Sequence, residues 1–141
     1  MTDTEDIEAI VFDYVSRMAK AEFEGLRTSS WPYAEPEGFP FLLVRQVAGY
    51  DAARTIDSGH SSEAVRVAFE ASAYSDSPAT RKADARAISI YVGKLFKTLG
   101  FTEVRMGGGP VDLIDPRGRA VACYDSRYEA EYGPDGLFHT F

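Results

Sequence analysis

The chain has 141 residues, a formal net charge of −7 and one cysteine, Cys123. This length is typical of one domain that can bury a core without metal ions, and a single cysteine excludes an internal disulfide. The acidity opposes tight binding to nucleic acids, although it also fits an ordinary role in solubility. No apolar run approaches the ~20 residues of a membrane span. The N-terminus, MTDTEDIEAI, is acidic where a signal peptide is basic, so we expect the chain to be made in the cytosol.

The first forty residues predict a helix and then an extended segment. We expect a helix over residues 4–24, where apolar side chains recur with a 3.6-residue period, and Gly25 would end it. These apolar positions are Ile7, Val11, Tyr14, Met18 and Ala21. Residues 28–40 contain three prolines, which exclude a helix interior and a central strand. Because the same segment holds three aromatic residues, we expect an ordered crossover packed on the domain.

Two strands are predicted for residues 41–48 and 63–74. In the second strand, one face carries Val65, Val67, Phe69, Ala71 and Ala73, and the other carries Arg66, Ala68, Glu70, Ser72 and Tyr74. Alternation with a period of two over this length indicates a strand with one buried face. The loop of residues 49–62 is long enough to join the two strands as antiparallel neighbours, and a short strand near residues 55–56 fits within it.

A second amphipathic helix is predicted over residues 78–99. Ser77 would be its N-cap, Pro78 would hold the first helical position, and Gly100 would end the helix. The predicted buried stripe comprises Ala85, Ile88, Val92, Leu95 and Leu99, and the opposite face comprises Lys82, Arg86, Ser89, Gly93 and Lys97.

The C-terminal third predicts a hairpin. Residues 101–106 form a short strand or extended segment, and residues 111–114 and 119–132 flank the type I turn Asp115-Pro-Arg-Gly118. The fold class that follows is α+β, with one domain over residues 1–141 and the order α-β-β-α-β-β. We expect a mixed, mainly antiparallel sheet with two long amphipathic helices packed on it. Residues 1–3 and 133–141 are predicted to be loosely ordered.

Residue types that often carry chemistry are present, but their spacing favours structural roles. The two histidines are far apart, Cys123 fits a strand, and Gly107–Gly109 precedes Pro110 and a strand instead of a helix N-terminus. Asp112, Asp115 and Asp125 flank the hairpin and could form a carboxylate cluster. Since the turn accounts for Asp115, we predict no catalytic, cofactor-binding or metal-binding residues.

The outward face of the 63–74 strand carries Arg66, Glu70 and Tyr74. Its charge is too mixed for a nucleic-acid platform, which needs aromatic residues interleaved with positive charge. Two interpretations stay open: a solvated face, or a subunit interface, where Tyr and Arg are enriched.

Four segments together resemble one family. RTIDS at Arg54–Ser58 and FEASAYS at Phe69–Ser75 are similar to a pattern R-T-L/I-D-S … F-E-V-x-V-Y-S. GFT at Gly100–Thr102 and RYEA at Arg127–Ala130 follow in the same order. This pattern resembles that of the minor capsid or tail-completion proteins that act as tail terminators in long-tailed bacteriophages. The similarity spans roughly residues 40–130, with Ala71 and Ala73 in place of larger aliphatic residues.

The resemblance implies a non-enzymatic virion structural protein at the head–tail junction, present in the host cytoplasm during assembly. It implies a homohexameric ring that closes the tail tube, ends tail polymerisation and joins the tail to the head through the neck. The implied partners are other copies of the chain, the major tail tube protein and the head-completion (stopper) protein, with no cofactor and no membrane. DNA would pass through the lumen without specific binding.

On this hypothesis the subunit or neck interface includes Arg54, Thr55, Asp57, Ser58, Arg66, Glu70 and Tyr74. A local salt bridge between Arg54 and Asp57 is an equally compatible interpretation of that loop. Two alternatives remain: another connector subunit of the neck, such as a head-closure protein, or a small α+β ligand-binding or hydrolytic domain that uses the three aspartates.

Overall fold

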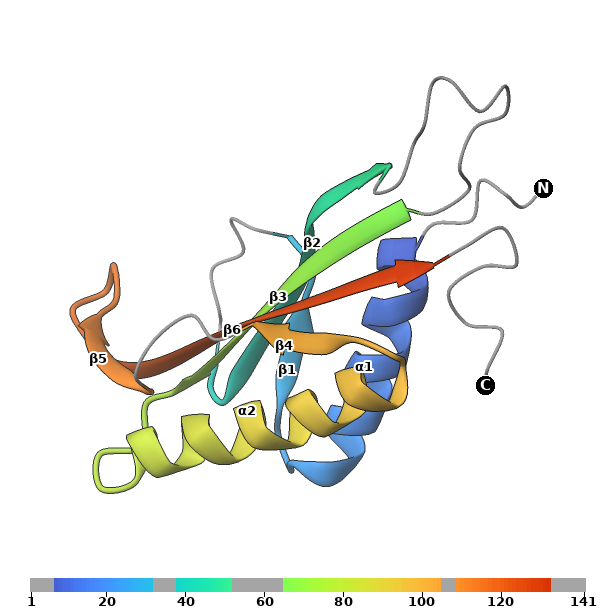
Figure 1. The fold of residues 1–141 in the computed structure, drawn as a ribbon. Helices are drawn as coiled ribbons and strands as arrows, with labels where there is room; N and C mark the ends of the chain where they lie inside the picture. Colours follow the sequence, from blue (N-terminus) through green and yellow to red (C-terminus); the bar gives the residue numbers. More distant parts are fainter. Residues whose placement is uncertain (1–6, 32–37, 52–64, 105–108, 133–141) are drawn as a thin grey trace, which may run out of the picture.

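The computed structural model describes residues 7–31, 38–51, 65–104 and 109–132, which form one α+β domain with two helices and a six-stranded mixed sheet (Figure 1). The elements in chain order are α1 (Ile7–Glu22), β1 (Arg27–Ser29), β2 (Phe41–Asp51), β3 (Val65–Ser75), α2 (Arg81–Thr98), β4 (Thr102–Val104), β5 (Val111–Ile114) and β6 (Ala120–Tyr132). The predicted order α-β-β-α-β-β is therefore incomplete, because β1 and β4 add two short strands.

The sheet has the strand order β1-β2-β3-β6-β4, and β5 also pairs with β6. The β2–β3 pair is antiparallel, as the loop between these strands predicted. The pairs that β6 makes with β3, β4 and β5 are antiparallel too, whereas β1 and β2 are parallel. Gly25, which has a φ of +78°, forms the turn between α1 and β1, and β1 contains the first residues of the predicted crossover, which lie beside β2.

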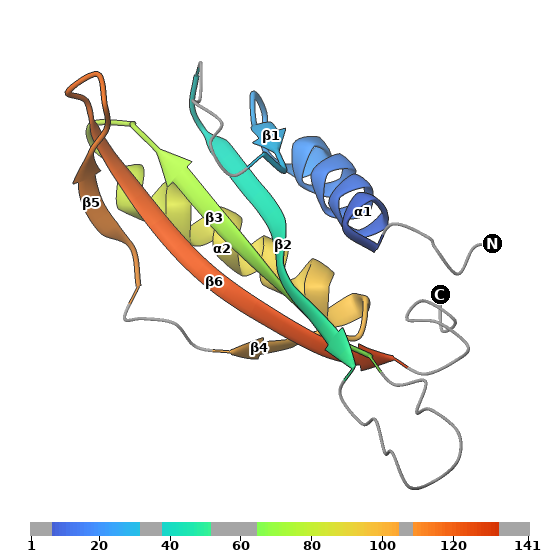
Figure 2. The ribbon, with the colours of Figure 1, turned by 90° about the horizontal axis from the view of Figure 1, so that it is seen from above.

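Both helices pack on the same side of the sheet. Helix α2 contacts β3 and β6, and α1 contacts β1, β2 and α2, so α1 lies next to the β1 side of the molecule (Figure 2). The predicted buried stripe of α2 and the predicted inward residues of β3 from Val67 to Ala73 are buried. Two outward predictions are wrong. Ala68 is buried among longer charged neighbours, and Ser89 is buried because its hydroxyl bonds that of Ser126 at 3.0 Å.

The start of α2 also differs from the prediction. The helix begins at Arg81 with Thr80 as the N-cap, and the preceding residues form a turn instead of the first helical turn. The Thr80 hydroxyl hydrogen-bonds to Ser77 at 2.9 Å and to the Asp84 carboxylate at 2.9 Å, which stabilises this turn. The Ser77-Pro78 signal therefore predicts the start of α2 about one turn too early.

The end of α2 is a Schellman motif, as the glycine signal predicted. Gly100 has a φ of +94°, and its N–H donates to the Lys97 carbonyl at 3.0 Å. The Phe101 N–H donates to the Phe96 carbonyl at 2.9 Å, and the two rings pack edge-on with centroids 5.2 Å apart. The predicted type I turn is also present, since the Gly118 N–H donates to the Asp115 carbonyl at 2.8 Å. None of the helices in the described residues combines the length and apolar character that a membrane crossing requires.

Candidate interaction surface

The structure places three of the seven predicted interface residues. Arg66, Glu70 and Tyr74 lie on the outward face of β3, the face that α1 and α2 leave uncovered. The loop residues Arg54, Thr55, Asp57 and Ser58 lie in 52–64, outside the described residues.

Glu70 is the centre of an ion-pair row that crosses three strands. Arg45 of β2 and Arg127 of β6 stand directly opposite Glu70 in the sheet register. The Arg45 Nη2 atom lies 3.2 Å from Glu70 Oε1, and the Arg127 Nη1 atom lies 3.6 Å from Glu70 Oε2. Residues directly opposite one another on neighbouring strands have Cβ atoms about 5 Å apart, so the register itself brings these charges together.

The row continues toward the end of β6. Arg127 Nε lies 3.1 Å from Glu129 Oε2, and Arg66 bridges Glu129 at 3.4 Å and Glu131 at 2.6 Å. We call this set the charge ladder: Arg45, Glu70, Arg127, Glu129, Arg66 and Glu131. Its side chains are 22–50% exposed, and its three arginines and three glutamates cancel in formal charge. A neutral, internally paired surface offers little attraction to a phosphate backbone.

The other end of this face is largely buried. The Phe41 and Tyr74 rings lie with centroids 5.9 Å apart, and Cys123 stands opposite Tyr74 in the register. Burial, followed by the nearby charge of Asp125, raises the pKa of the Cys123 thiol to about 12. Burial is also the main cause that raises the pKa of Tyr74 to about 12. A thiol that stays protonated at neutral pH is a poor nucleophile, which agrees with the structural role predicted for Cys123.

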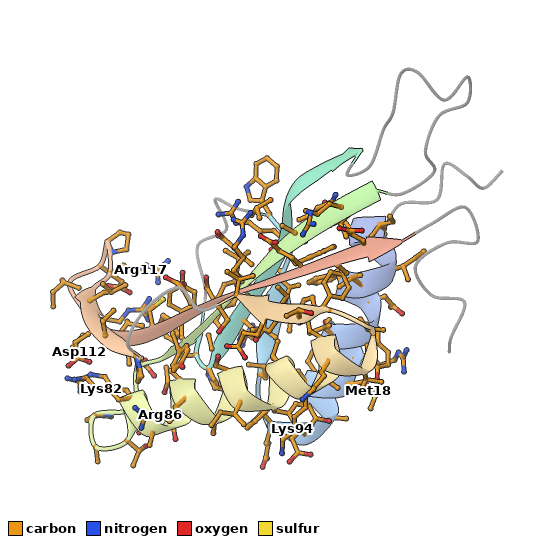
Figure 3. All side chains as sticks on the ribbon, in the orientation of Figure 1. Met18, Lys82, Arg86, Lys94, Asp112 and Arg117 are labelled. Atoms are coloured by element: carbon orange, nitrogen blue, oxygen red, sulfur yellow. The ribbon has the colours of Figure 1, made fainter. Side chains whose placement is uncertain are left out.

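The three aspartates of the hydrolytic alternative do not converge. Asp112 faces α2, where it lies 2.9 Å from Arg81 Nε and 3.6 Å from Lys82 Nζ, and its hydrogen bond from Arg81 lowers its pKa (Figure 3). Asp115 accepts hydrogen bonds from the backbone of its own turn. Asp125 lies on the opposite face of the sheet and accepts a 2.6 Å hydrogen bond from Ser72. Within the described ranges, no group of three or more His, Cys, Asp or Glu side chains could hold a metal ion.

A cavity of about 330 Å³ lies between the end of α1 and the first half of α2. Carboxylates and apolar side chains line it together. The carboxylates are Glu22, Glu24, Asp76 and Asp84, and the apolar residues include Phe23, Phe39, Pro40 and Ile88. None of the three hairpin aspartates lines it. One of its carboxylates, Asp84, already accepts hydrogen bonds from Ser75 and Thr80.

The sequence predictions missed an apolar edge of the sheet. Four of the six exposed large hydrophobic residues in the described part of the chain lie on β4 and β5: Val104, Val111, Leu113 and Ile114. Figure 1 shows β5 at one end of the sheet, far from α1. The hairpin pattern predicted a strand here, but the sequence V-D-L-I does not indicate whether another segment or another chain covers the outer edge of that strand.

The chain matches no protein-family model and no curated protein. Three features of the described residues bear on its function: the charge ladder, the apolar sheet edge, and the positions of the three described segments that carry the family resemblance.

Proposed function

We propose that the chain is a virion structural protein that forms a ring at the end of a phage tail tube, ends tail polymerisation and joins the tail to the head through the neck. The observation that carries this proposal is that the described segments of the resemblance meet in space. Phe69, Phe101 and Tyr128 come from three such segments, and all three surround Phe96 of α2. The ring centroids of Phe69 and Phe101 are 5.6 Å apart, and Tyr128 stacks on Phe96 at 4.2 Å.

The same segments also meet on the other side of the sheet. Glu70 follows Phe69, Arg127 precedes Tyr128, and the two charged side chains pair in the charge ladder. Residues that match one family pattern are expected to contact each other when the fold is shared, and these residues do so on both faces of the sheet. The convergence therefore supports the resemblance beyond the order of the motifs along the chain.

The described surfaces are compatible with a ring subunit. A ring forms when two different patches of one subunit meet in successive copies and the rotation closes. The charge ladder is accessible for contact with a neighbour or a neck protein, because its side chains are at least 22% exposed. With a net charge of −7 per subunit, an acidic or neutral lumen would let DNA slide without sticking.

Deletion of the gene from its phage or prophage, followed by electron microscopy of the lysate, tests the proposal. We expect overlong tails without heads, and supplying the wild-type chain in trans should restore joined particles of normal tail length. Loss of a head-closure subunit, the alternative within the neck, would leave free tails of normal length, since the tube would still be terminated. Normal virions after deletion would contradict both neck functions.

A further inference from the structure

Exposed apolar side chains of the described residues gather at two opposite sides of the sheet. Val111 and Leu113 project from β5 at one edge, and Trp31, which is 62% exposed, lies two residues after the end of β1 at the other edge. The strand order places β2, β3 and β6 between β1 and β5, and β4 pairs with another stretch of β6. Open edge strands with apolar residues are prone to pair with another chain, and natural proteins usually block them with charge or cover.

The two edge strands lie at the same level along the sheet. Starting from β1, the register connects Arg27 to Phe41, Phe41 to Tyr74, Tyr74 to Cys123 and Cys123 to Val111. One row of side chains on the outward face thus runs across the sheet from Arg27 on one edge to Val111 on the other. Copies related by rotation alone, without a shift along the strands, would bring these two edges together.

The strand directions also suit such a contact. Strand β1 is parallel to β2, and the antiparallel pairs β2–β3 and β3–β6 make it parallel to β6 as well. Strand β5 is antiparallel to β6, so it runs opposite to β1. If the strand direction is kept from one copy to the next, β5 and the neighbouring β1 are antiparallel, the arrangement of most strand pairs in this sheet.

Charge favours a second copy as the occupant of the β5 edge. Residues 81–86 and 109–119, at the start of α2 and along the hairpin, carry five Lys or Arg and three Asp, a net charge of +2. Figure 3 shows Lys82, Arg86 and Arg117 at this end of the molecule. The remaining residues carry −9, the difference between −7 and +2, so long-range attraction favours the approach of this end to another copy, while the local fit at the β1 edge comes from its register and apolar residues because Arg27 there is positive.

We propose that the β5 edge of one copy docks beside β1 and Trp31 of the next copy, antiparallel and at the same level, as the repeated contact of the ring. This inference rests on the proposed function, and it names the surfaces through which the subunits meet. The contact is heterologous, because two different edges take part, and it can therefore repeat around a closed ring.

Disulfide trapping tests the contact, with Arg27→Cys in one chain and Val111→Cys in another. Both variants carry Cys123→Ala, because Cys123 stands directly opposite Val111 and would otherwise pair with it. We expect a covalent dimer under mild oxidation only when the two variants are mixed. A mixture of Arg27→Cys with Ile90→Cys is the matched control, since Ile90 is on α2 and is 54% exposed against 53% for Val111. A dimer from Val111→Cys alone would mean two-fold edge pairing and would overturn the proposal.

A single chain that carries both cysteines separates this inference from the proposed function. We expect a ladder of covalent multimers that stops at a fixed size, which would be the number of subunits in the ring. A ladder without an upper limit would support the contact and contradict a closed ring. Rings seen by native mass spectrometry or electron microscopy without any cross-link would support the proposed ring and overturn the proposed contact between β5 and β1.

A non-covalent comparison gives a second measurement. Val111→Asp should weaken self-association by about tenfold per contact, the factor expected for losing one partly buried aliphatic side chain, whereas Ile90→Asp should leave it unchanged. Equal effects of the two substitutions would count against the β5 edge, provided that both variants keep the wild-type circular dichroism spectrum.

Discussion

Replacement of Phe96 by alanine should be among the most destabilising single changes in this protein. Phe96 is fully buried, stacks on Tyr128 with an interplanar angle of 5°, and packs against Phe101 and Phe69. A fully buried Phe-to-Ala change typically costs about 3–5 kcal/mol, because the transfer free energy of the ring is lost and a cavity is left. Since the rings of three partners enclose this site, we expect limited collapse of the cavity and a loss of about 4 kcal/mol.

Equilibrium unfolding in urea, followed by far-ultraviolet circular dichroism, measures this loss. With a slope of about 1.5–2 kcal/mol per molar urea, 4 kcal/mol lowers the midpoint by about 2 M. Trp31 is a poor fluorescent reporter, because it is already 62% exposed in the folded state. Ile90→Ala is the control on the same helix, and it should change the stability by about 0.5 kcal/mol or less because Ile90 is largely exposed.

A Phe96→Ala loss below about 1.5 kcal/mol would refute the packing argument. It would mean that the four rings do not form one tightly packed cluster. The convergence of Phe69, Phe101 and Tyr128 would then lose its weight as support for the family resemblance.

Three further predictions concern the helix end, the buried acids and the charge ladder. Gly100→Ala should cost about 1 kcal/mol in thermal or urea unfolding, since a φ of +94° strains any residue with a Cβ; no loss would contradict the Schellman geometry. Burial raises the pKa values of Cys123, Tyr74 and Tyr128 to about 12 from 9.0 for the thiol and 10.0 for the phenols. The unfolded chain therefore loses these protons at a lower pH than the folded chain does. The free energy of unfolding should be constant below pH 9.0 and fall as the pH rises toward about 12. A urea midpoint that stays constant over that range would exclude these pKa shifts. Glu70→Lys should lower the free energy of unfolding by only about 1 kcal/mol, because its ion pairs are partly exposed. The same substitution should block joining of tails to heads if the charge ladder contacts a neck partner. Normal joining would mean that the charge ladder is a solvent-exposed surface.

Local patterns in the sequence predicted most of the individual elements. The period-two alternation from Val65 to Ala73 placed one strand and its buried face, because side chains on a strand point to opposite sides in turn. The 3.6-residue stripe from Ala85 to Leu99 and the glycine after it placed the second helix and its end. The turn at Asp115–Gly118 followed from its residue types alone. These features depend on neighbours only a few residues apart.

Several sequence predictions failed where partners are distant along the chain. Ser89 looked like a surface residue, but it is buried because Ser126 supplies a hydroxyl partner for it. The parallel pairing of β1 with β2 had no local signal, because the two strands are joined through a proline-containing segment whose composition says nothing about alignment. The role of the loop at Arg54–Ser58 remains a prediction, since it lies outside the described residues.

The sequence by itself determined where the long helices and strands lie and which of their faces are mainly apolar, because those properties follow from backbone geometry and side-chain periodicity. Only the tertiary structure decided which faces and edges meet. It brought Glu70 between Arg45 and Arg127 and put Val111, which is 53% exposed among the described residues, on an edge strand level with Arg27. The physical reason is that register and strand order are set by the packing of the whole sheet, in which each pairing is fixed by contacts between residues far apart in the chain.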